Sequence, residues 1–169
     1  MLDIIEEENI HRNAIESLLD ASFGADRLKK TAYRLRDGIR SIPALSLVAI
    51  EGNEHCKVVG TIRYWPILVG GATASLLLGP IAVAAHRQGR GLGGRLIRMS
   101  LDKAMALGHQ SVILVGDAPY YERFGFLREL TRGMEMPGPV DMNRLLGLEL
   151  VDGALACAVG AVTPMIVPE

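Results

Sequence analysis

Residues 86–97, HRQGRGLGGRLI, contain four glycines and three arginines. Apolar side chains then recur at helical spacing through residue 105, which predicts an amphipathic helix. The first backbone N–H groups of a helix have no helical partner, and glycines let a ligand approach them closely. The segment therefore predicts an anion site, to which Arg87, Arg90 and Arg95 add charge suited to phosphate oxygens.

The loop excludes one class of phosphate binder and leaves another open. It lacks the Gly-Lys-Ser/Thr ending of a nucleotide P-loop, which disfavours a kinase or ATPase. Gly89, Gly91 and Gly94 satisfy the G-x-G-x-x-G pattern of NAD and FAD binders, and Asp117 follows the next predicted strand as a ribose-binding acid would. The alternative of a dinucleotide binder stays open, although a meander precedes the loop instead of a first βαβ unit.

Strand signals precede the loop. Residues 2–7 predict a first strand, and three segments rich in branched apolar residues predict an antiparallel meander: 45–52, 57–69 and 74–83. The uncharged run 64–85 is long enough to span a bilayer, but Pro66 and Pro80 interrupt it. We interpret this run as two buried strands joined at a Gly-Gly turn, and we expect no membrane segment.

The rest of the chain mixes helix and strand signals. Helical spacing predicts helices over 10–19 and 27–39, and unbroken apolar character predicts a strand over 111–116 that is buried on both faces. After it we expect a short helix, two strands and a closing hairpin, over residues 118–125, 126–130, 145–151 and 153–169. These elements predict one mixed α/β domain over residues 1–169.

Composition narrows the function classes. The formal net charge of -1 leaves no broad basic surface, which disfavours nucleic-acid binding. Cys56 and Cys157 are far apart and are interpreted as small core residues, and the four histidines lack metal-ligand spacing, so we expect no metal. Residues 1–12 carry acids where a signal peptide has a basic start, which favours the cytoplasm.

Two motifs together suggest a family. Gln88, Gly91 and Gly93 fit the pattern Q/R-x-x-G-x-G/A, and YYERFGF at 120–126 resembles a Y-E-K-x-G-F segment. With the order of predicted elements, they make most of the chain resemble the GNAT N-acetyltransferases, and in particular a branch of small bacterial acetyltransferases. The resemblance implies a central, mostly antiparallel twisted sheet flanked by helices, with parallel strands splayed at a cofactor slot.

The resemblance also implies the chemistry. We expect acetyl-CoA as co-substrate and direct transfer of its acetyl group to a primary amine of a small molecule or peptide. Tyr121 matches the family tyrosine near the sulfur, which acts as general acid. Asp117 stands near the usual asparagine of the family and is implied to orient the cofactor or a substrate, although a helix N-cap explains it equally well. The residues implied to bind coenzyme A are Ile81, Ala82 and Val83 for the pantetheine arm, and Gln88, Gly89, Arg90, Gly91, Leu92, Gly93 and Gly94 for the pyrophosphate.

The chain departs from many relatives in one respect. Their fourth strand often carries a glutamate that acts as general base, whereas residues 75–85 contain no acid. A coenzyme-A-binding protein without transfer activity is therefore a second alternative. We expect loops 21–30 and 132–144 to recognise the acceptor, and the C-terminal hairpin either to close a homodimer interface or to fill its own core.

Overall fold

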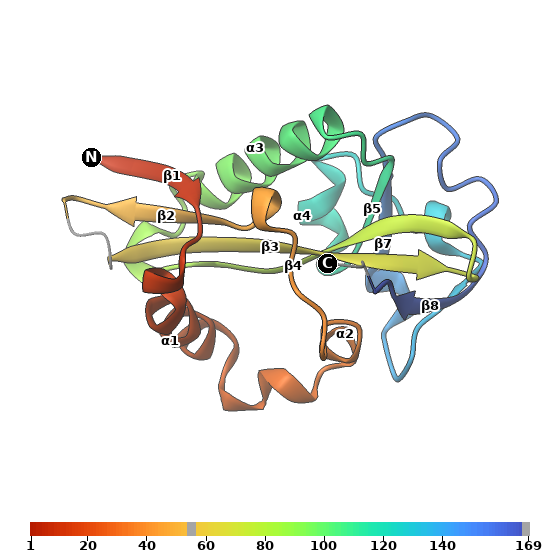
Figure 1. Cartoon of the computed structure of the whole chain (residues 1–169), viewed down its shortest axis with the longest axis horizontal. Helices are drawn as coiled ribbons and strands as arrows, with labels where there is room; N and C mark the ends of the chain where they lie inside the picture. The colour runs from red at the N-terminus through yellow and green to blue at the C-terminus, as the bar shows by residue number, and fades with distance from the viewer. Residues whose placement is uncertain (54–56, 167–169) are drawn as a thin grey trace. The chain divides into compact units, whose positions relative to one another are not determined.

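The computed structural model describes residues 1–53 and 57–166. The chain divides into two compact units. The first contains residues 1–29, 41–64 and 79–104, and the second contains residues 30–40, 65–78 and 105–169. Two long strands, β3 (Val58–Val69) and β4 (Thr73–Val83), contribute residues to both units (Figure 1).

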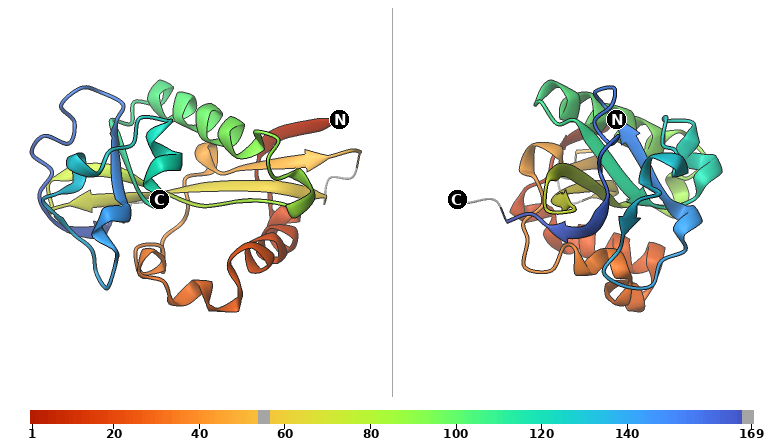
Figure 2. Two further views of the ribbon diagram at one scale, coloured as in Figure 1. Left: turned by 180° about the vertical axis from the view of Figure 1, so that it is seen from behind. Right: turned by 90° about the vertical axis from the view of Figure 1, so that its right-hand side faces the viewer.

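The first unit is a sheet with one helix on each face. β1 (Leu2–Glu6) pairs antiparallel with β2 (Leu47–Glu51), and β2 pairs antiparallel with the start of β3. In Figures 1 and 2, α1 (Arg12–Phe23) covers one face of these strands and α3 (Leu92–Ala106) covers the other. This arrangement confirms the predicted first strand, the start of the meander and the helix that follows the glycine loop.

Burial on one stripe of α1 explains how that helix is held. Ile15, Leu18 and Leu19 are buried and pack against Val48 and Ile50 of β2. Positions three and four apart lie on the same face of a helix, so a single stripe meets the sheet. A short helix is only marginally stable by itself. Full burial of one such side chain contributes about 1.5–3 kcal/mol, which compensates for that low intrinsic stability.

A close approach and a buried hydrogen bond hold α3 on the opposite face. A Cβ at Gly60 of β3 would lie 3.1 Å from Leu96 Cδ1 and 3.3 Å from Leu92 Cδ2, so glycine allows this helix to approach the strand closely. The Tyr64 hydroxyl lies 2.7 Å from Ser100 Oγ, and both residues are fully buried. This bond satisfies two polar groups that would otherwise be costly to bury.

The second unit is built around a mixed set of strands. β5 (Ser111–Val115) pairs antiparallel with β7 (Leu145–Glu149) along its whole length. It also pairs in parallel with β4, where Leu76 faces Val112 and Leu77 faces Ile113. Four residues of β5 in a row are buried, which confirms the strand predicted to be covered on both faces. The predicted mixed α/β fold with a mainly antiparallel sheet is thus confirmed.

The remaining elements of the second unit surround one apolar core. β8 (Gly160–Pro164) pairs antiparallel with β3 and in parallel with β6 (Met134–Glu135), while α2 (Thr31–Arg34) and α4 (Ala118–Glu122) are short helices. The core contains Leu35, Ile67, Val69, Leu77, Ile113, Met134, Leu145, Leu155, Ala158 and Val162. Single 3-10 turns occupy Asn9–His11, Ala25–Lys29, Pro43–Leu45, Ala85–Arg87, Arg128–Thr131 and Met142–Arg144.

The uncharged run 64–85 forms strands, as predicted. It supplies the end of β3 and all of β4, which are joined by a turn at Gly70 and Gly71. Both glycines have positive φ, 61° and 69°, the backbone that a tight hairpin between twisted strands requires. Among the residues that the structure describes, no helix is long and apolar enough to cross a membrane.

Two expected elements are wrong in type or length. The helix expected over 27–39 is reduced to α2, and Arg27 before it is nearly buried in ion pairs with Glu16 and Asp20 of α1. The strand expected over 126–130 is only a bridge at Leu127 and then a 3-10 turn. The turn forms because the Thr131 hydroxyl bonds the carbonyls of Arg128 and Leu145, an alternative to strand pairing.

The C-terminal region is also corrected. Residues 153–158 form turns, not the first strand of a hairpin, and β8 pairs with the distant strands β3 and β6. Leu155 and Ala158 are buried in the same apolar core as Val162 of β8, so this segment packs against the core without pairing as a strand. Cys157 is exposed, so its interpretation as a core residue is wrong, and Cys56 lies outside the described residues.

The contact at Gly60 gives a test of how α3 is held. We expect Gly60→Val to lower the free energy of unfolding by about 2 kcal/mol, because the new side chain overpacks against Leu92 and Leu96. Urea unfolding followed by circular dichroism measures the change. Ala74→Val adds the same branched side chain at an exposed position of β4 and should have little effect. Equal destabilisation by both variants would contradict the proposed contact.

Candidate active site

The glycine loop lies in the first unit, between the end of β4 and the start of α3. A single 3-10 turn, η4 (Ala85–Arg87), leads into Gln88, whose side-chain Nε2 donates to the Val83 carbonyl at 3.1 Å. The Arg95 amide donates to the Gly91 carbonyl at 3.0 Å. The backbone donors at the start of α3 therefore lie directly after an exposed loop.

Two glycines give this loop its shape. Gly89 and Gly91 have φ values of 77° and 81°, in the left-handed region that side chains other than glycine rarely adopt. A Cβ placed on either residue would meet no atom within 4 Å, so the backbone here is open to a ligand. Leu92, in contrast, is buried and anchors the helix, and Gly94 is buried beside it in the first turn.

The predicted pantetheine-binding residues form the last part of β4. Ala82 is buried and packs with the α1 cluster, whereas Ile81 and Val83 are half-buried. Successive side chains of a strand point to opposite faces, so the side chains of Ile81 and Val83 face away from α1. The structure therefore brings the predicted residues 81–83 and 88–94 into one unit.

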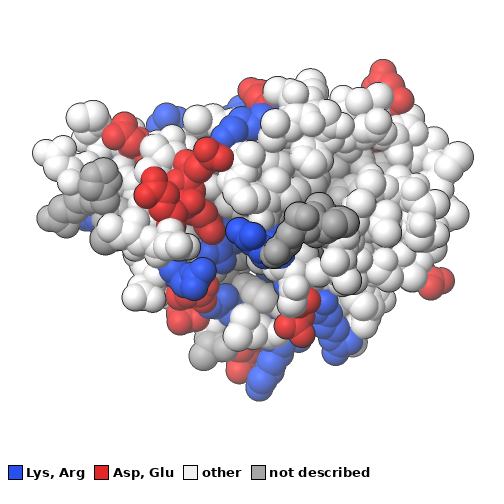
Figure 3. All heavy atoms as spheres, viewed as in Figure 1, with Lys and Arg blue, Asp and Glu red and all other residues white. Residues whose placement is uncertain are grey.

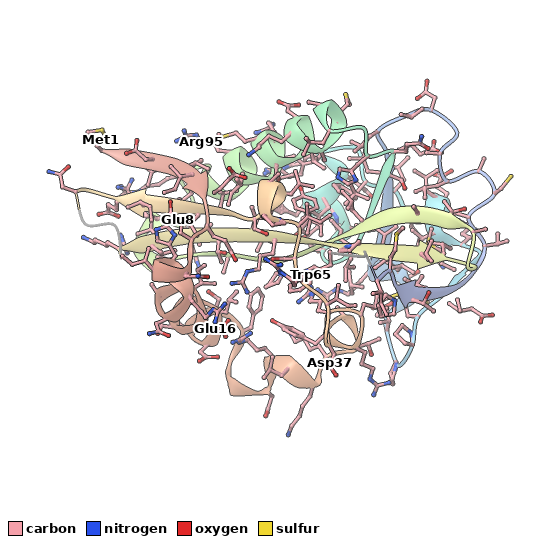
Figure 4. All side chains as sticks on the ribbon, viewed as in Figure 1. Met1, Glu8, Glu16, Asp37, Trp65 and Arg95 are labelled. Carbon is pink, nitrogen blue, oxygen red and sulfur yellow. The ribbon has the colours of Figure 1, made fainter. Side chains whose placement is uncertain are left out.

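Positive side chains around the loop divide into two groups. Arg90 and Arg95 are exposed, and Figure 4 labels Arg95 at the start of α3. Arg87 instead donates from Nε to Glu51 Oε2 at 2.9 Å, and His86 Nε2 lies 2.9 Å from the same oxygen. Of the three arginines expected to bind phosphate, Arg87 thus uses one of its N–H groups to bind a carboxylate of the protein itself.

Sequence reasoning missed Glu51. The pKa of its carboxyl is lowered from 4.5 to about 2, chiefly by hydrogen bonds from His86 and Arg87, with further attraction from Lys57. Glu51 ends β2, and 36 positions separate it from Arg87, so no spacing rule links the two residues. The only local signal was an acid at the end of an apolar strand.

Tyr121 lies in the second unit, on α4, in an aromatic group. Its ring stacks on Tyr120 with centroids 5.0 Å apart and meets Phe126 edge-on at 6.0 Å. The ring also contacts Gly116, where a Cβ would lie 2.9 Å from Tyr121 Cδ2. Glycine at the end of β5 therefore makes room for this tyrosine.

The surroundings of Tyr121 keep its phenol protonated. Burial raises the pKa of the Tyr121 phenol to about 12, and the neighbouring Tyr120 and Asp117 add to the rise, whereas Arg144 opposes it. An ordinary tyrosine has a pKa of about 10. At neutral pH the Tyr121 hydroxyl is thus a hydrogen-bond donor.

Asp117 occupies the N-cap position of α4, but its exposed side chain makes no capping hydrogen bond. Only its backbone carbonyl takes part, accepting from the Tyr121 amide at 3.0 Å. Asp117 is therefore an N-cap by position and not by side-chain chemistry.

One of the two expected acceptor loops is tied to α2. The Thr31 hydroxyl donates to the Pro139 carbonyl at 2.5 Å, and Arg34 Nη1 donates to the Pro137 carbonyl at 2.8 Å. The Arg36 guanidinium lies 4.5 Å from the centre of the Tyr33 ring and 5.8 Å from that of Trp65. These half-buried aromatic residues give this part of the second unit a polar and aromatic surface.

On the described part of the chain, the distribution of charge and of metal-binding side chains indicates neither a nucleic-acid surface nor a metal site. On the face drawn in Figure 3, basic and acidic residues are interspersed, without a broad area of one sign. Within residues 1–53 and 57–166, no group of three or more His, Cys, Asp or Glu side chains could hold a metal ion.

The raised pKa of Tyr121 can be tested by titration. We expect the phenol that is lost in Tyr121→Phe to ionise near pH 12, seen as the difference in near-ultraviolet absorbance between the two proteins. Because the folded pKa is the higher one, this group stabilises the fold fully below pH ~10, and that contribution is lost as the pH rises toward 12. A missing phenol that titrated at the ordinary tyrosine value would contradict this environment.

Comparisons with known proteins agree on a family. Residues 12–126 match the model of the Acetyltransferase (GNAT) family. YhbS of Escherichia coli K12, an uncharacterized N-acetyltransferase, is 32% identical over 114 residues, which are 66% of this chain and 65% of YhbS. YjhQ of the same strain, also an uncharacterized N-acetyltransferase, is 38% identical over 109 residues, 62% of this chain and 58% of YjhQ. The matched part thus spans less than two thirds of either relative.

Solved structures extend the similarity to the fold. YhbS from Escherichia coli in complex with CoA superposes with a TM-score of 0.81 at 28% identity, over 97% of this chain and 89% of that chain. A GNAT family acetyltransferase from Brucella melitensis in complex with acetyl-CoA gives 0.60 at 29% identity, over 88% of both chains. The family match includes the glycine loop and Tyr121, and the chain belongs to the GNAT acetyltransferase family.

Proposed function

We propose that this protein transfers the acetyl group of acetyl-CoA to a primary amine of a small molecule or peptide. The observation that carries the proposal is the open, left-handed glycine loop that leads into the N-terminus of α3. Family membership and the CoA-bound relatives support the choice of coenzyme A over other phosphate ligands. In this proposal, residues 1–169 form one acetyltransferase domain.

The backbone of residues 88–94 would bind the pyrophosphate. Gly89 and Gly91 leave their main chain uncovered, and the N-terminus of the 15-residue helix α3 carries partial positive charge toward it. Arg90 and Arg95 are exposed and would pair with phosphate oxygens. Main-chain groups of Ile81, Ala82 and Val83 would bind the pantetheine arm, which contains the amide groups needed for such pairing.

Tyr121 would assist departure of the thiol. As the amine nitrogen bonds to the acetyl carbon, the carbon–sulfur bond breaks and negative charge develops on sulfur. A phenol whose pKa is about 12 stays protonated and donates a hydrogen bond to that charge. The proton released by the amine balances the one gained by the thiolate, so Tyr121 keeps its own proton through the cycle.

Deprotonation of the amine would not use β4. The sequence of β4, TASLLLGPIAV, contains no carboxylate, so the proposal has water accept the amine proton or the acceptor bind in its neutral form. Asp117, whose exposed carboxylate makes no capping hydrogen bond, would orient the cofactor or a substrate. Glu135 and Asp141, in the loop beside α2, are exposed and would attract a cationic acceptor. The cytoplasmic location and the homodimer stay predictions.

Loss of coenzyme A binding on substitution of the loop tests the ligand assignment. We expect Gly91→Glu to weaken acetyl-CoA binding at least about tenfold, because it adds a negative charge and forces a side chain into the left-handed region. Titration calorimetry measures the Kd, with NADH as the second ligand. Gly108→Glu is the matched control, since Gly108 has φ 89° and open space at the end of α3. Binding of NADH without binding of acetyl-CoA would favour the dinucleotide alternative.

Turnover separates an acetyltransferase from a protein that only binds coenzyme A. With an amine found by screening, we expect Tyr121→Phe to lower kcat about 10- to 100-fold and to leave the Kd for acetyl-CoA unchanged. Tyr120→Phe removes the adjacent phenol and should change kcat little. Acetyl-CoA binding by the wild type, without turnover of any amine in the screen, would support the binding protein instead.

A further inference from the structure

The carboxylate of Glu51 connects one end of a strand to the glycine loop. Its Oε2 atom lies 2.9 Å from Arg87 Nε and 2.9 Å from His86 Nε2, and its Oε1 atom lies 3.6 Å from Lys57 Nζ. The Glu51 side chain is 21% exposed and that of Arg87 is 24% exposed, so this pair is partly shielded from water. Three cationic or potentially cationic groups thus converge on one acid.

Glu51 itself is held on both sides by the backbone. It is the last residue of β2, where it faces Leu2 of β1, and its amide donates to the Lys57 carbonyl at 3.1 Å. The carboxylate therefore extends from an ordered strand end and not from a free loop. His86 and Arg87, in contrast, belong to the single turn η4 that leads directly into Gln88.

Two other hydrogen bonds connect this turn to residues close to it in the sequence. Gln88 ties it back to the Val83 carbonyl, and Arg87 donates its amide to the Ala84 carbonyl at 2.8 Å. Both bonds are local, within five residues. The Ala84 amide, at the N-cap of this turn, also donates to the Val59 carbonyl of β3 at 2.8 Å. The bonds to the Glu51 carboxylate cross more than thirty positions of sequence and are the long-range restraint on the side chains of the turn itself.

We propose that Glu51 is a positioning residue that holds η4, and with it the pyrophosphate loop, in the conformation that binds coenzyme A. The inference rests on the proposed function, since it assigns to the loop the ligand proposed above. Glu51 acts through Arg87 and His86 and does not itself touch the ligand. A loop restrained before binding loses less conformational freedom when the ligand arrives.

Simple electrostatics predicts the opposite effect, which makes the proposal testable. A carboxylate near an anion site repels the pyrophosphate, so its removal by itself should tighten binding. For two charges about one Debye length apart in water, such repulsion changes Kd only about twofold. Loss of two charge-assisted hydrogen bonds that order the loop should weaken binding by roughly tenfold. The restraint should therefore outweigh the repulsion.

The ionisation of Glu51 sets the conditions for the measurement. Its pKa is lowered to about 2, so the carboxylate is charged at any pH suited to binding experiments. The stabilisation that it provides is present above the ordinary pKa of 4.5 and is lost as the pH falls toward 2. A change between neutral and mildly alkaline pH therefore leaves the restraint in place.

Glu51→Gln is the variant that tests this role. We expect the Kd for acetyl-CoA to rise about tenfold by calorimetry, while the weak binding of pantetheine, which lacks the pyrophosphate, stays unchanged by NMR titration. Glu6→Gln removes the same charge from an exposed residue of the first unit and should leave both constants unchanged. Hydrogen exchange at residues 85–91 should become faster in Glu51→Gln only.

A double variant shows whether Arg87 carries the effect. If it does, Glu51→Gln combined with Arg87→Gln should bind acetyl-CoA no more weakly than Arg87→Gln alone. Equal or tighter binding of acetyl-CoA by Glu51→Gln would overturn the inference and favour simple repulsion. Should Glu51→Gln fail to fold, Glu51→Asp keeps the charge on a shorter side chain and is expected to weaken acetyl-CoA binding by an intermediate amount. If the wild type itself did not bind acetyl-CoA, the proposed function would fail first.

Discussion

The first turn of α3 presents backbone N–H groups that have no partner within the helix, and the arrangement of the first unit follows from keeping them accessible. An anion reaches such groups only where no side chain covers them, which requires glycine at positions 89 and 91. The helix must also be firmly held, because a mobile donor array binds weakly. Leu92 and Leu96 provide that support by packing on β3 at Gly60, and the Tyr64–Ser100 hydrogen bond extends it along the helix.

Charges near the loop have two distinct uses. Arg90 and Arg95 are directed to solvent and are available to a phosphate ligand, whereas Arg87 and His86 bond to Glu51. An acid beside an anion site is unfavourable by Coulomb's law alone, so its presence is best explained by what it orders. Tyr121 shows a related use of environment in the second unit. Burial is the main cause that raises its pKa and keeps its phenol protonated, so a hydrogen-bond donor is available at neutral pH.

The elements that were predicted correctly are those whose signal is local. Unbroken apolar character identified β5. Two prolines and two glycines in residues 64–85 correctly indicated strands and not a membrane helix. The errors occur where a distant partner decides. Residues 126–130 leave the strand conformation because Thr131 bonds the Leu145 carbonyl. β8 pairs with the distant strands β3 and β6, and the core that they share also buries Leu155 and Ala158. Arg27, at the start of the helix predicted over 27–39, likewise forms ion pairs with distant residues of α1.

The same distinction between local signals and distant partners applies to the candidate site. The family and the open shape of the glycine loop were predictable from two short motifs, because glycine conformation and the open end of a helix depend on residues a few positions apart. The restraint from Glu51, the room that Gly116 makes for Tyr121 and the raised pKa of that phenol were not predictable. They depend on which strand ends lie beside which loops and on how much water is excluded from a side chain, and both are set by packing between segments far apart in the chain.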